Sequence, residues 1–213
     1  MRNVTYTVVL ALVLAVPAAH AYELTFEERL EAQTAIERVY LSHRSGTTRS
    51  FERAVPQGVL REKVRTYLKQ TVALEQYWNT SVTAEMLDRE LERMIRQTLM
   101  PERLEELFAA LGNDPLLIRE GLARPALVNR LTRNFFRTDE RIHEAATTTW
   151  DDWWQQHADA FDEAEVKTVA RDTPLPQVFP AGTGPTEGGC PVADTWDNGS
   201  LSDALDGRIG HTA

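Results

Sequence analysis

LREKVRTYLKQTVALEQYW, residues 60–78, carries the clearest helical pattern in the sequence. Apolar side chains recur in it at steps of four and three residues, interrupted only by Thr71: Leu60, Val64, Tyr67, Leu74 and Trp78. Positions at these steps fall on one face of an α-helix. The stretch therefore predicts an amphipathic helix that must bury that face against other helices.

Capping signals predict further helices on both sides of this one. Thr25, followed by Glu28, has the spacing of a capping box and begins a helix over about residues 26–43. Thr83 is a second N-cap, and Pro101 suits the first turn of the next helix, which Gly112 ends.

Another capping signal marks the start of the next helix. Asp114 and Pro115 form an N-cap and first-turn pair, and Pro125 must kink the helix that they begin or restart it. A last helical stretch is expected over about residues 139–166. No alternation of apolar and polar residues typical of strands occurs before residue 175. We therefore expect an all-α, multi-helix bundle over residues 22–166.

The N-terminus has the pattern of a secretory signal peptide. Arg2 precedes a short apolar run over residues 8–16, and Ala19-His20-Ala21 is typical of a cleavage site. The run is too short for a stable membrane-spanning helix, although an uncleaved anchor is the alternative interpretation. We expect residues 1–21 to be removed and the mature chain to be exported, to a periplasm or the extracellular space, with no membrane insertion afterwards.

The last third of the chain differs in composition. From Thr147 onward there are 12 Asp/Glu against 3 Lys/Arg, and residues 172–213 hold 5 Pro and 7 Gly. This composition predicts an acidic, disordered linker over residues 167–213. The net charge of −9 and the lack of a basic patch argue against binding to nucleic acid.

No motif for catalysis or for a cofactor is present. The sequence has no nucleophile elbow, phosphate loop, dinucleotide fingerprint or zinc-protease motif. The single cysteine, Cys190, has no nearby base to activate it. His143 and His157 lie among acidic residues, but their spacing matches no tight metal site, and a solvated acidic helix face explains them better. We predict no enzyme activity, no cofactor and no metal.

Three tryptophans, Trp150, Trp153 and Trp154, form the most unusual cluster in the sequence. They could form an exposed aromatic surface that binds peptides, because tryptophan buries a large apolar area at little cost in entropy. The favoured interpretation is that they cover the open end of the helix bundle.

Residues 60–136 also resemble a known family in the order of their elements. After the helix of residues 60–78 come SVTAEMLDRELERM (81–94) and ERLEELFAALGNDPLLIREGLARPALVNRL (102–131). The helix start Val82–Met86, the run Phe108–Gly112 and the run Leu117–Glu120 are similar to elements of the N-terminal helical domain of SurA-type periplasmic chaperones, relatives of the parvulin-type prolyl isomerases. The residues that match are packing and capping residues.

The resemblance implies a helical domain that holds extended, apolar-rich segments of unfolded exported proteins. Methionine and aromatic side chains offer an adaptable apolar surface for such partners. The candidate peptide-binding residues are Tyr77, Trp78, Met86, Met94, Phe108, Trp150, Trp153 and Trp154. The catalytic domain of the isomerases would need about 90 further residues in an α+β fold, and the acidic remainder of this chain cannot supply it.

The end of the chain is similar to a different pattern. Asp194-Thr195-Trp196 and the final run Arg208–Ala213 resemble the seam between two kelch-type propeller repeats. The alternative function is therefore an N-terminal structural or cap domain of a larger secreted β-propeller protein, of which this chain would be a fragment. Repeats of the same type encoded after residue 213 would support that alternative.

Overall fold

The structure is a computed structural model that describes residues 22–44, 49–143, 148–170 and 174–176. Their regular elements are helices of different length and type, and no β-strand occurs among them. In chain order they are α1 (Phe26–Ser42), α2 (Phe51–Ala54), α3 (Gln57–Gln76), α4 (Ala84–Gln97), α5 (Pro101–Ala110), α6 (Pro115–Ile118), the π-helix η1 (Arg119–Ala123), α7 (Arg124–Thr138), α8 (Glu140–His143), α9 (Trp150–His157), and the 3-10 turns η2 (Ala158–Ala160) and η3 (Glu163–Glu165). The all-α prediction is confirmed for this part of the chain.

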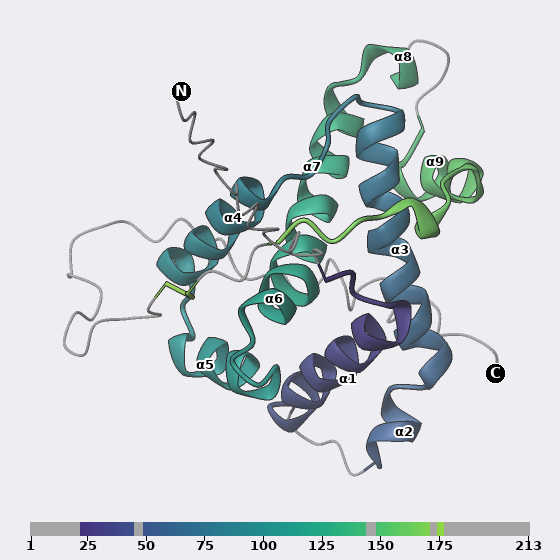
Figure 1. Ribbon diagram of the computed structural model, residues 1–213. Helices are drawn as coiled ribbons and strands as arrows, with labels where there is room; N and C mark the ends of the chain where they lie inside the picture. Colours follow the sequence, from purple (N-terminus) through teal and green to yellow (C-terminus); the bar gives the residue numbers. More distant parts are fainter. Residues whose placement is uncertain (1–21, 45–48, 144–147, 171–173, 177–213) are drawn as a thin grey trace, which may run out of the picture.

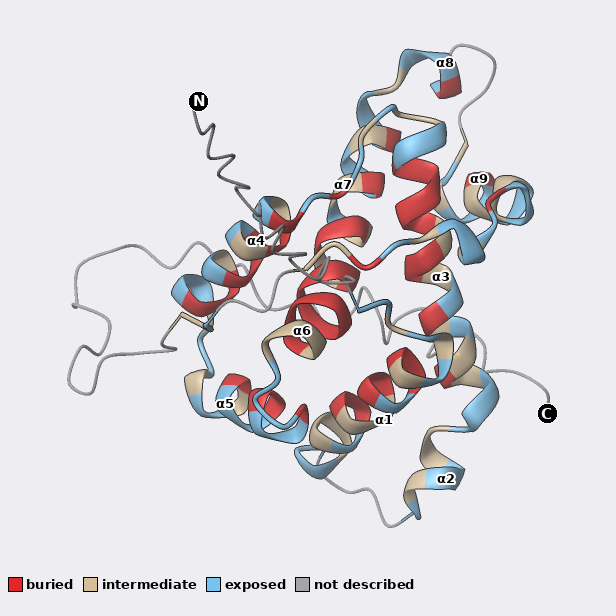
Figure 2. Cartoon of the chain, in the orientation of Figure 1, coloured by how far each residue is buried: buried red, intermediate tan, exposed pale blue. Residues whose placement is uncertain are grey.

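The bundle is organised around α3 and α7, which pack along each other. Helix α1 crosses beneath them, α4 flanks α7, and α8 and α9 lie at the far end of α3 (Figure 1). The buried residues lie on the inner faces of these helices (Figure 2). One apolar cluster joins α1, α4 and α5 to α6 and the end of η1, and a second joins α1, α3, α4 and α7.

The predicted helix starts are confirmed in their capping contacts. The Thr25 side chain accepts a hydrogen bond from the Glu28 amide, and the Glu28 carboxylate accepts one from the Thr25 amide at 2.8 Å, which completes the capping box. Thr83 caps α4 through the Met86 amide at 3.3 Å. Each contact satisfies an amide that the first turn of a helix leaves without a partner.

Pro125 is accommodated by a widened turn. A proline lacks the amide hydrogen, and its ring clashes with the carbonyl four residues earlier, here that of Gly121. The π-helix η1 directly precedes the proline, and α7 begins at Arg124. The chain thus continues from α6 into α7 through five residues of wider helix, and all five are buried. Single π-turns of this kind are frequent at functional sites.

The last predicted helix differs from the observed structure. The described residues of this stretch, 139–143 and 148–166, form two short helices, α8 and α9, and two 3-10 turns, instead of one helical stretch. Asp139 and Asp162 each stand at the start of a new element with extended backbone, so the helical path breaks there. Residues 167–170 and 174–176, which were expected in the linker, contact the helices. The packed part of the chain therefore extends past the boundary expected at residue 166.

Several predictions concern residues outside the described ranges. These are the signal peptide, Cys190, the acidic linker beyond residue 176 and the kelch-like start, and they stay predictions. Among the described helices, none combines the length and the apolar character that a membrane crossing requires.

Alanine substitutions at two glycines test the backbone conformation at the end of α5. Gly112 has a φ of +68°, the left-handed conformation that favours glycine, whereas Gly58 lies in the first turn of α3, and a Cβ at either position meets open space. We expect Gly112→Ala to lower the free energy of unfolding by about 1 kcal/mol, and Gly58→Ala to leave it unchanged or raise it slightly. Urea unfolding of both variants measures this. Equal effects would contradict the assigned backbone at Gly112.

Candidate functional site

A buried ion cluster lies where α1, α7 and η1 meet. Glu120 of η1 accepts hydrogen bonds from Arg29 of α1 at 3.0 Å and from Arg124 of α7 at 2.7 and 2.9 Å. The side chains of Glu120, Arg124 and Arg29 are 0%, 1% and 3% exposed. We call these three residues the Glu120 cluster. It contains two cations and one anion, so it carries an excess positive charge away from solvent.

The electrostatics of the cluster follow from its hydrogen bonds. Burial alone raises the pKa of Glu120, but the hydrogen bonds and charges of Arg124, the charge of Arg29 and the amide of Ala170 together lower it to about 2. Glu120 is therefore ionised at neutral pH. A charge in this position is tolerated only because it is paired and fully hydrogen-bonded.

Tyr67 of α3 adds a polar group next to the cluster. Burial raises the pKa of its hydroxyl, while the nearby charge of Arg29 opposes that rise. The Tyr67 oxygen is buried next to the guanidinium of Arg29. Tyr67 thus adds a polar group to the buried surroundings of Arg29.

An extended segment of the same chain, residues 166–170, completes the cluster. Its backbone is neither helix nor strand, and Val166 has the extended angles φ −72° and ψ 120°. The amides of Val169 and Ala170 donate to one oxygen of Glu120 at 2.9 and 3.0 Å. The Lys167 carbonyl accepts from Arg124 at 3.2 Å. Glu120 therefore accepts five hydrogen bonds, which uses the capacity of a carboxylate.

Thr168 fixes the middle of the extended segment. Its hydroxyl oxygen accepts from Arg29 at 3.2 Å and from the Leu24 amide at 2.8 Å. Its own amide donates to the Glu23 carboxylate at 2.8 Å. The segment is thus held between the N-terminal residues and the buried arginines, and its main chain makes most of the polar contacts.

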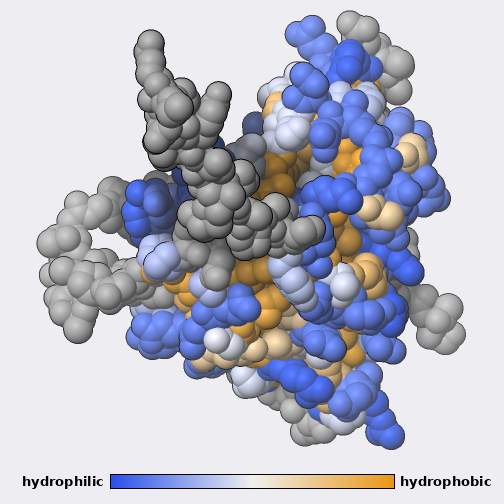
Figure 3. All heavy atoms as spheres, in the orientation of Figure 1, coloured by the Kyte–Doolittle hydropathy of each residue, from blue (hydrophilic) through white to orange (hydrophobic). Residues whose placement is uncertain are grey.

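Apolar contacts flank these hydrogen bonds. Val166, Val169 and Ala170 pack against the cluster of α1, α3 and α7, and Leu175 packs against the cluster of α1, α4 and α5. Figure 1 shows the described parts of this path running from beside α9 across α3 and α7, and ending near α4. On the same face, Figure 3 shows hydrophobic residues between rims of hydrophilic ones.

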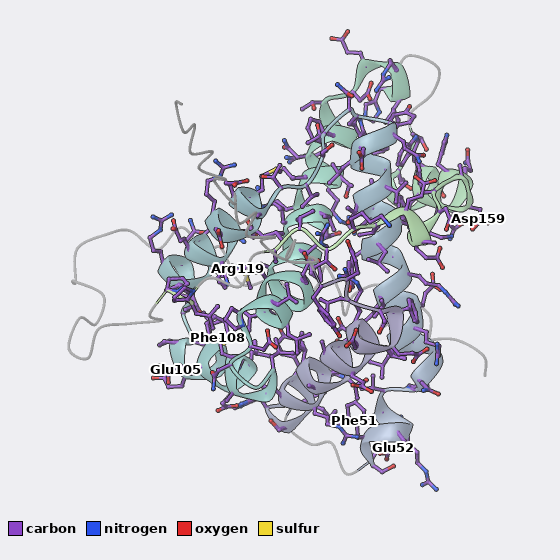
Figure 4. The ribbon with its side chains drawn as sticks, in the orientation of Figure 1. Phe51, Glu52, Glu105, Phe108, Arg119 and Asp159 are labelled. Atoms are coloured by element: carbon purple, nitrogen blue, oxygen red, sulfur yellow. The ribbon has the colours of Figure 1, made fainter. Side chains whose placement is uncertain are left out.

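Arg119 contacts the later described residues of this segment, at Pro174. It lies beside α4, as Figure 4 shows, and donates to Asp88 of that helix at 2.5 Å. It also donates to the carbonyl oxygens of Pro115 at 3.2 Å and Pro174 at 3.4 Å. Two consecutive residues of η1 therefore contact this part of the main chain: Arg119 at Pro174, and Glu120 at Val169 and Ala170.

The lowered pKa of Glu120 predicts acid sensitivity. A carboxylate whose pKa is lower in the folded than in the unfolded chain stabilises the fold above its unfolded pKa, near 4.5, and this contribution is lost as the pH falls toward about 2. We expect the free energy of unfolding to fall over this range, by about 3 kcal/mol from Glu120. Urea unfolding at several pH values measures it. A Glu120→Gln variant should lose less, and an equal loss would contradict the assignment.

A second feature of the structure is an aromatic cluster at the far end of α3 and α7. Trp153 is its centre, with ring centroids 5.3 Å from Tyr77 and Trp78 and 4.6 Å from His157. Trp78 also donates to Asp139 at 2.9 Å. Because Trp153 is buried, the structure favours the interpretation in which α9 covers the end of the bundle.

The candidate peptide-binding residues of the sequence analysis divide into two groups. The aromatic cluster contains Tyr77, Trp78, Trp150, Trp153 and Trp154. The other three lie elsewhere: Met86 is half-buried beside the α3 core, and Met94 and Phe108 are buried against α1 and α5. In this conformation Met94, Phe108 and Trp153 offer no surface to a peptide, because other side chains of the bundle cover them.

The two histidines belong to the same aromatic region. His143 contacts the Phe136 carbonyl and His157 the Trp153 carbonyl, each at 2.8 Å. Within the described ranges, no group of three His, Cys, Asp or Glu side chains is placed to hold a metal ion.

Sequence reasoning missed Arg29, Glu120 and Arg124 as a site. The available signal was the four-residue spacing of Glu120 and Arg124 inside an apolar stretch, just before a proline. Arg29 could not be found in this way, because it comes from a helix 91 residues earlier. Comparison of the chain with protein-family models, curated proteins and solved structures gave no match.

Proposed function

We propose that this chain is an exported, non-catalytic helical module that binds extended polypeptide segments, as its resemblance to SurA-type domains implies. The observation that carries the proposal is the contact with residues 166–170. The bundle holds this extended segment through main-chain hydrogen bonds to Glu120 and Arg124 and through apolar contacts beside them. Contacts of this kind depend little on the identity of the side chains that are bound.

The chemistry of the site fits a binding role. Glu120 is held ionised and is fully hydrogen-bonded within the bundle, so it is not available as a general base. Arg29 and Arg124 donate to carbonyl and hydroxyl oxygens, which an extended chain presents along its whole length. The partners that fit are therefore unfolded or extended polypeptides.

Suppression of aggregation tests the proposal. The mature chain, residues 22–213, is added to a chemically denatured client protein as it is diluted into buffer, and light scattering is followed. We expect scattering to fall at stoichiometric amounts of the chain. Scattering that is unchanged at a large molar excess would overturn the proposal.

The exposed residues Leu99 and Met100 provide the matched control. They are 73% and 43% exposed in the turn between α4 and α5, and could hold a client nonspecifically. A Leu99→Ser, Met100→Ser double variant should suppress aggregation as well as the wild type does. Loss of suppression in this variant would assign client binding to the turn between α4 and α5 instead of the Glu120 cluster.

A further inference from the structure

We propose that residues 166–170 act as an intramolecular ligand that occupies the polypeptide site, and that clients bind by exchanging with it. The inference rests on the proposed function and adds the regulation of the site and its ligand class. That class is an extended segment with a hydroxyl residue, a β-branched apolar residue two positions before it, and small or β-branched apolar residues in the two positions after it. The run Val166–Ala170 has this pattern.

The contacts of this segment define the ligand class. Two amides and one carbonyl of its main chain bind Glu120 and Arg124, and these groups occur in every polypeptide. The Thr168 hydroxyl is the one side chain of the segment that reaches the buried arginines. Val166, Val169 and Ala170 fill the apolar surroundings, whereas Lys167 is exposed. A client that presents the same pattern can make the same contacts.

The charge of the Glu120 cluster favours replacement of the resident segment by a client over a site that is left empty. Arg29 and Arg124 remain paired to Glu120 when the segment leaves, so the walls of the site keep their shape. Their donors to Thr168 and to the Lys167 carbonyl, however, then lose partners inside the protein. Unpaired donors beside a buried positive charge are costly, so a second extended chain that supplies a hydroxyl and a carbonyl is preferred there.

The tether gives the resident segment an advantage over a free client. A segment on the same chain competes at an effective concentration of about millimolar, and a site that is open for only about a tenth of the time binds about tenfold more weakly. Weakening the resident segment should therefore tighten the binding of a free peptide by a similar factor.

A competition experiment on the full mature chain tests this. The probe is a fluorescein-labelled peptide with the sequence of residues 164–176, and fluorescence anisotropy measures its affinity. The variant Val169→Pro, Ala170→Pro removes both amides that donate to Glu120. We expect it to bind the probe about tenfold more tightly than the wild type does. The control Gln155→Ala, at an exposed position of α9, should bind like the wild type.

Two outcomes of this titration overturn the inference. Equal affinity of the wild type and the double-proline variant, with helix content preserved in circular dichroism, means that the resident segment does not block the site. Equal binding of a scrambled peptide of the same composition means that the site does not recognise the proposed pattern.

Trypsin cleavage gives a second test on the unmodified chain. Lys167 is exposed, but its carbonyl is bound to Arg124, and cleavage after it requires the segment to leave the site. A saturating client should accelerate this cleavage. If the client is protected from aggregation but the rate of cleavage is unchanged, the proposed exchange is wrong. The proposed function is not affected by that result. A client that neither binds nor is protected overturns both.

Discussion

Replacing Glu120 by glutamine is expected to lower the free energy of unfolding by about 3–5 kcal/mol. Glutamine has nearly the same shape, so the main loss is the negative charge that balances Arg29 and Arg124. Both guanidinium groups would then be buried without a counter-ion. Urea or guanidinium unfolding at neutral pH, followed by circular dichroism, measures the change.

Glu27 supplies the control for that experiment. Its pair with Arg61 spans 3.1 Å, similar to the pairs of the cluster, but its side chain is 64% exposed. Solvent screens such a pair, so we expect Glu27→Gln to change the free energy of unfolding by less than about 1 kcal/mol. Similar losses in the two variants would show that the Glu120 cluster is not buried as described.

The second large effect is expected at Trp153. Trp153→Ala removes the central ring of the aromatic cluster, which contacts Tyr77, Trp78 and Phe136. A substitution of this size in a buried position costs about 3–5 kcal/mol, because it loses the burial of the ring and leaves a cavity. Thermal and urea unfolding of residues 22–213 measure this cost.

Trp154 separates a structural from a binding role of these aromatic residues. It is half-buried, and its ring stacks on Trp150 and Phe161. Trp154→Ala should be less destabilising than Trp153→Ala, and it should suppress aggregation as well as the wild type does. A loss of client binding in Trp154→Ala without loss of stability would instead assign the site to this cluster.

The helical class could be predicted because it depends on local signals. The capping box of Thr25 and the apolar steps from Leu60 to Leu74 each belong to one helix, and the structure has both helices there, with Trp78 just after the end of α3. Pro125 correctly indicated a change in the helix, but the wider turn of η1 depends on its packing against α4 and α1, which spacing does not reveal.

The candidate site could not be predicted because it is assembled from distant residues. Glu120 receives hydrogen bonds from Arg29, 91 residues before it, and from the amides of Val169 and Ala170, about 50 residues after it. Residues 167–176 were assigned to the linker from their composition alone. Composition does not show whether a polar segment has partners in the fold, so the contacts of these residues could not be predicted. Met94 and Phe108 were chosen for their residue type, and type does not distinguish a core position from a surface one.

Hydrogen exchange at the amides of Val169 and Ala170 shows whether the extended segment is bound to Glu120 in solution. The bundle holds an extended stretch of its own main chain, in which the Val169 and Ala170 amides donate to Glu120. In the protein of residues 22–213 these two amides should exchange far more slowly than in the free peptide of residues 164–176, although they lie outside any helix. Exchange at the rate of the free peptide, while the interior of α3 stays protected, would contradict the account.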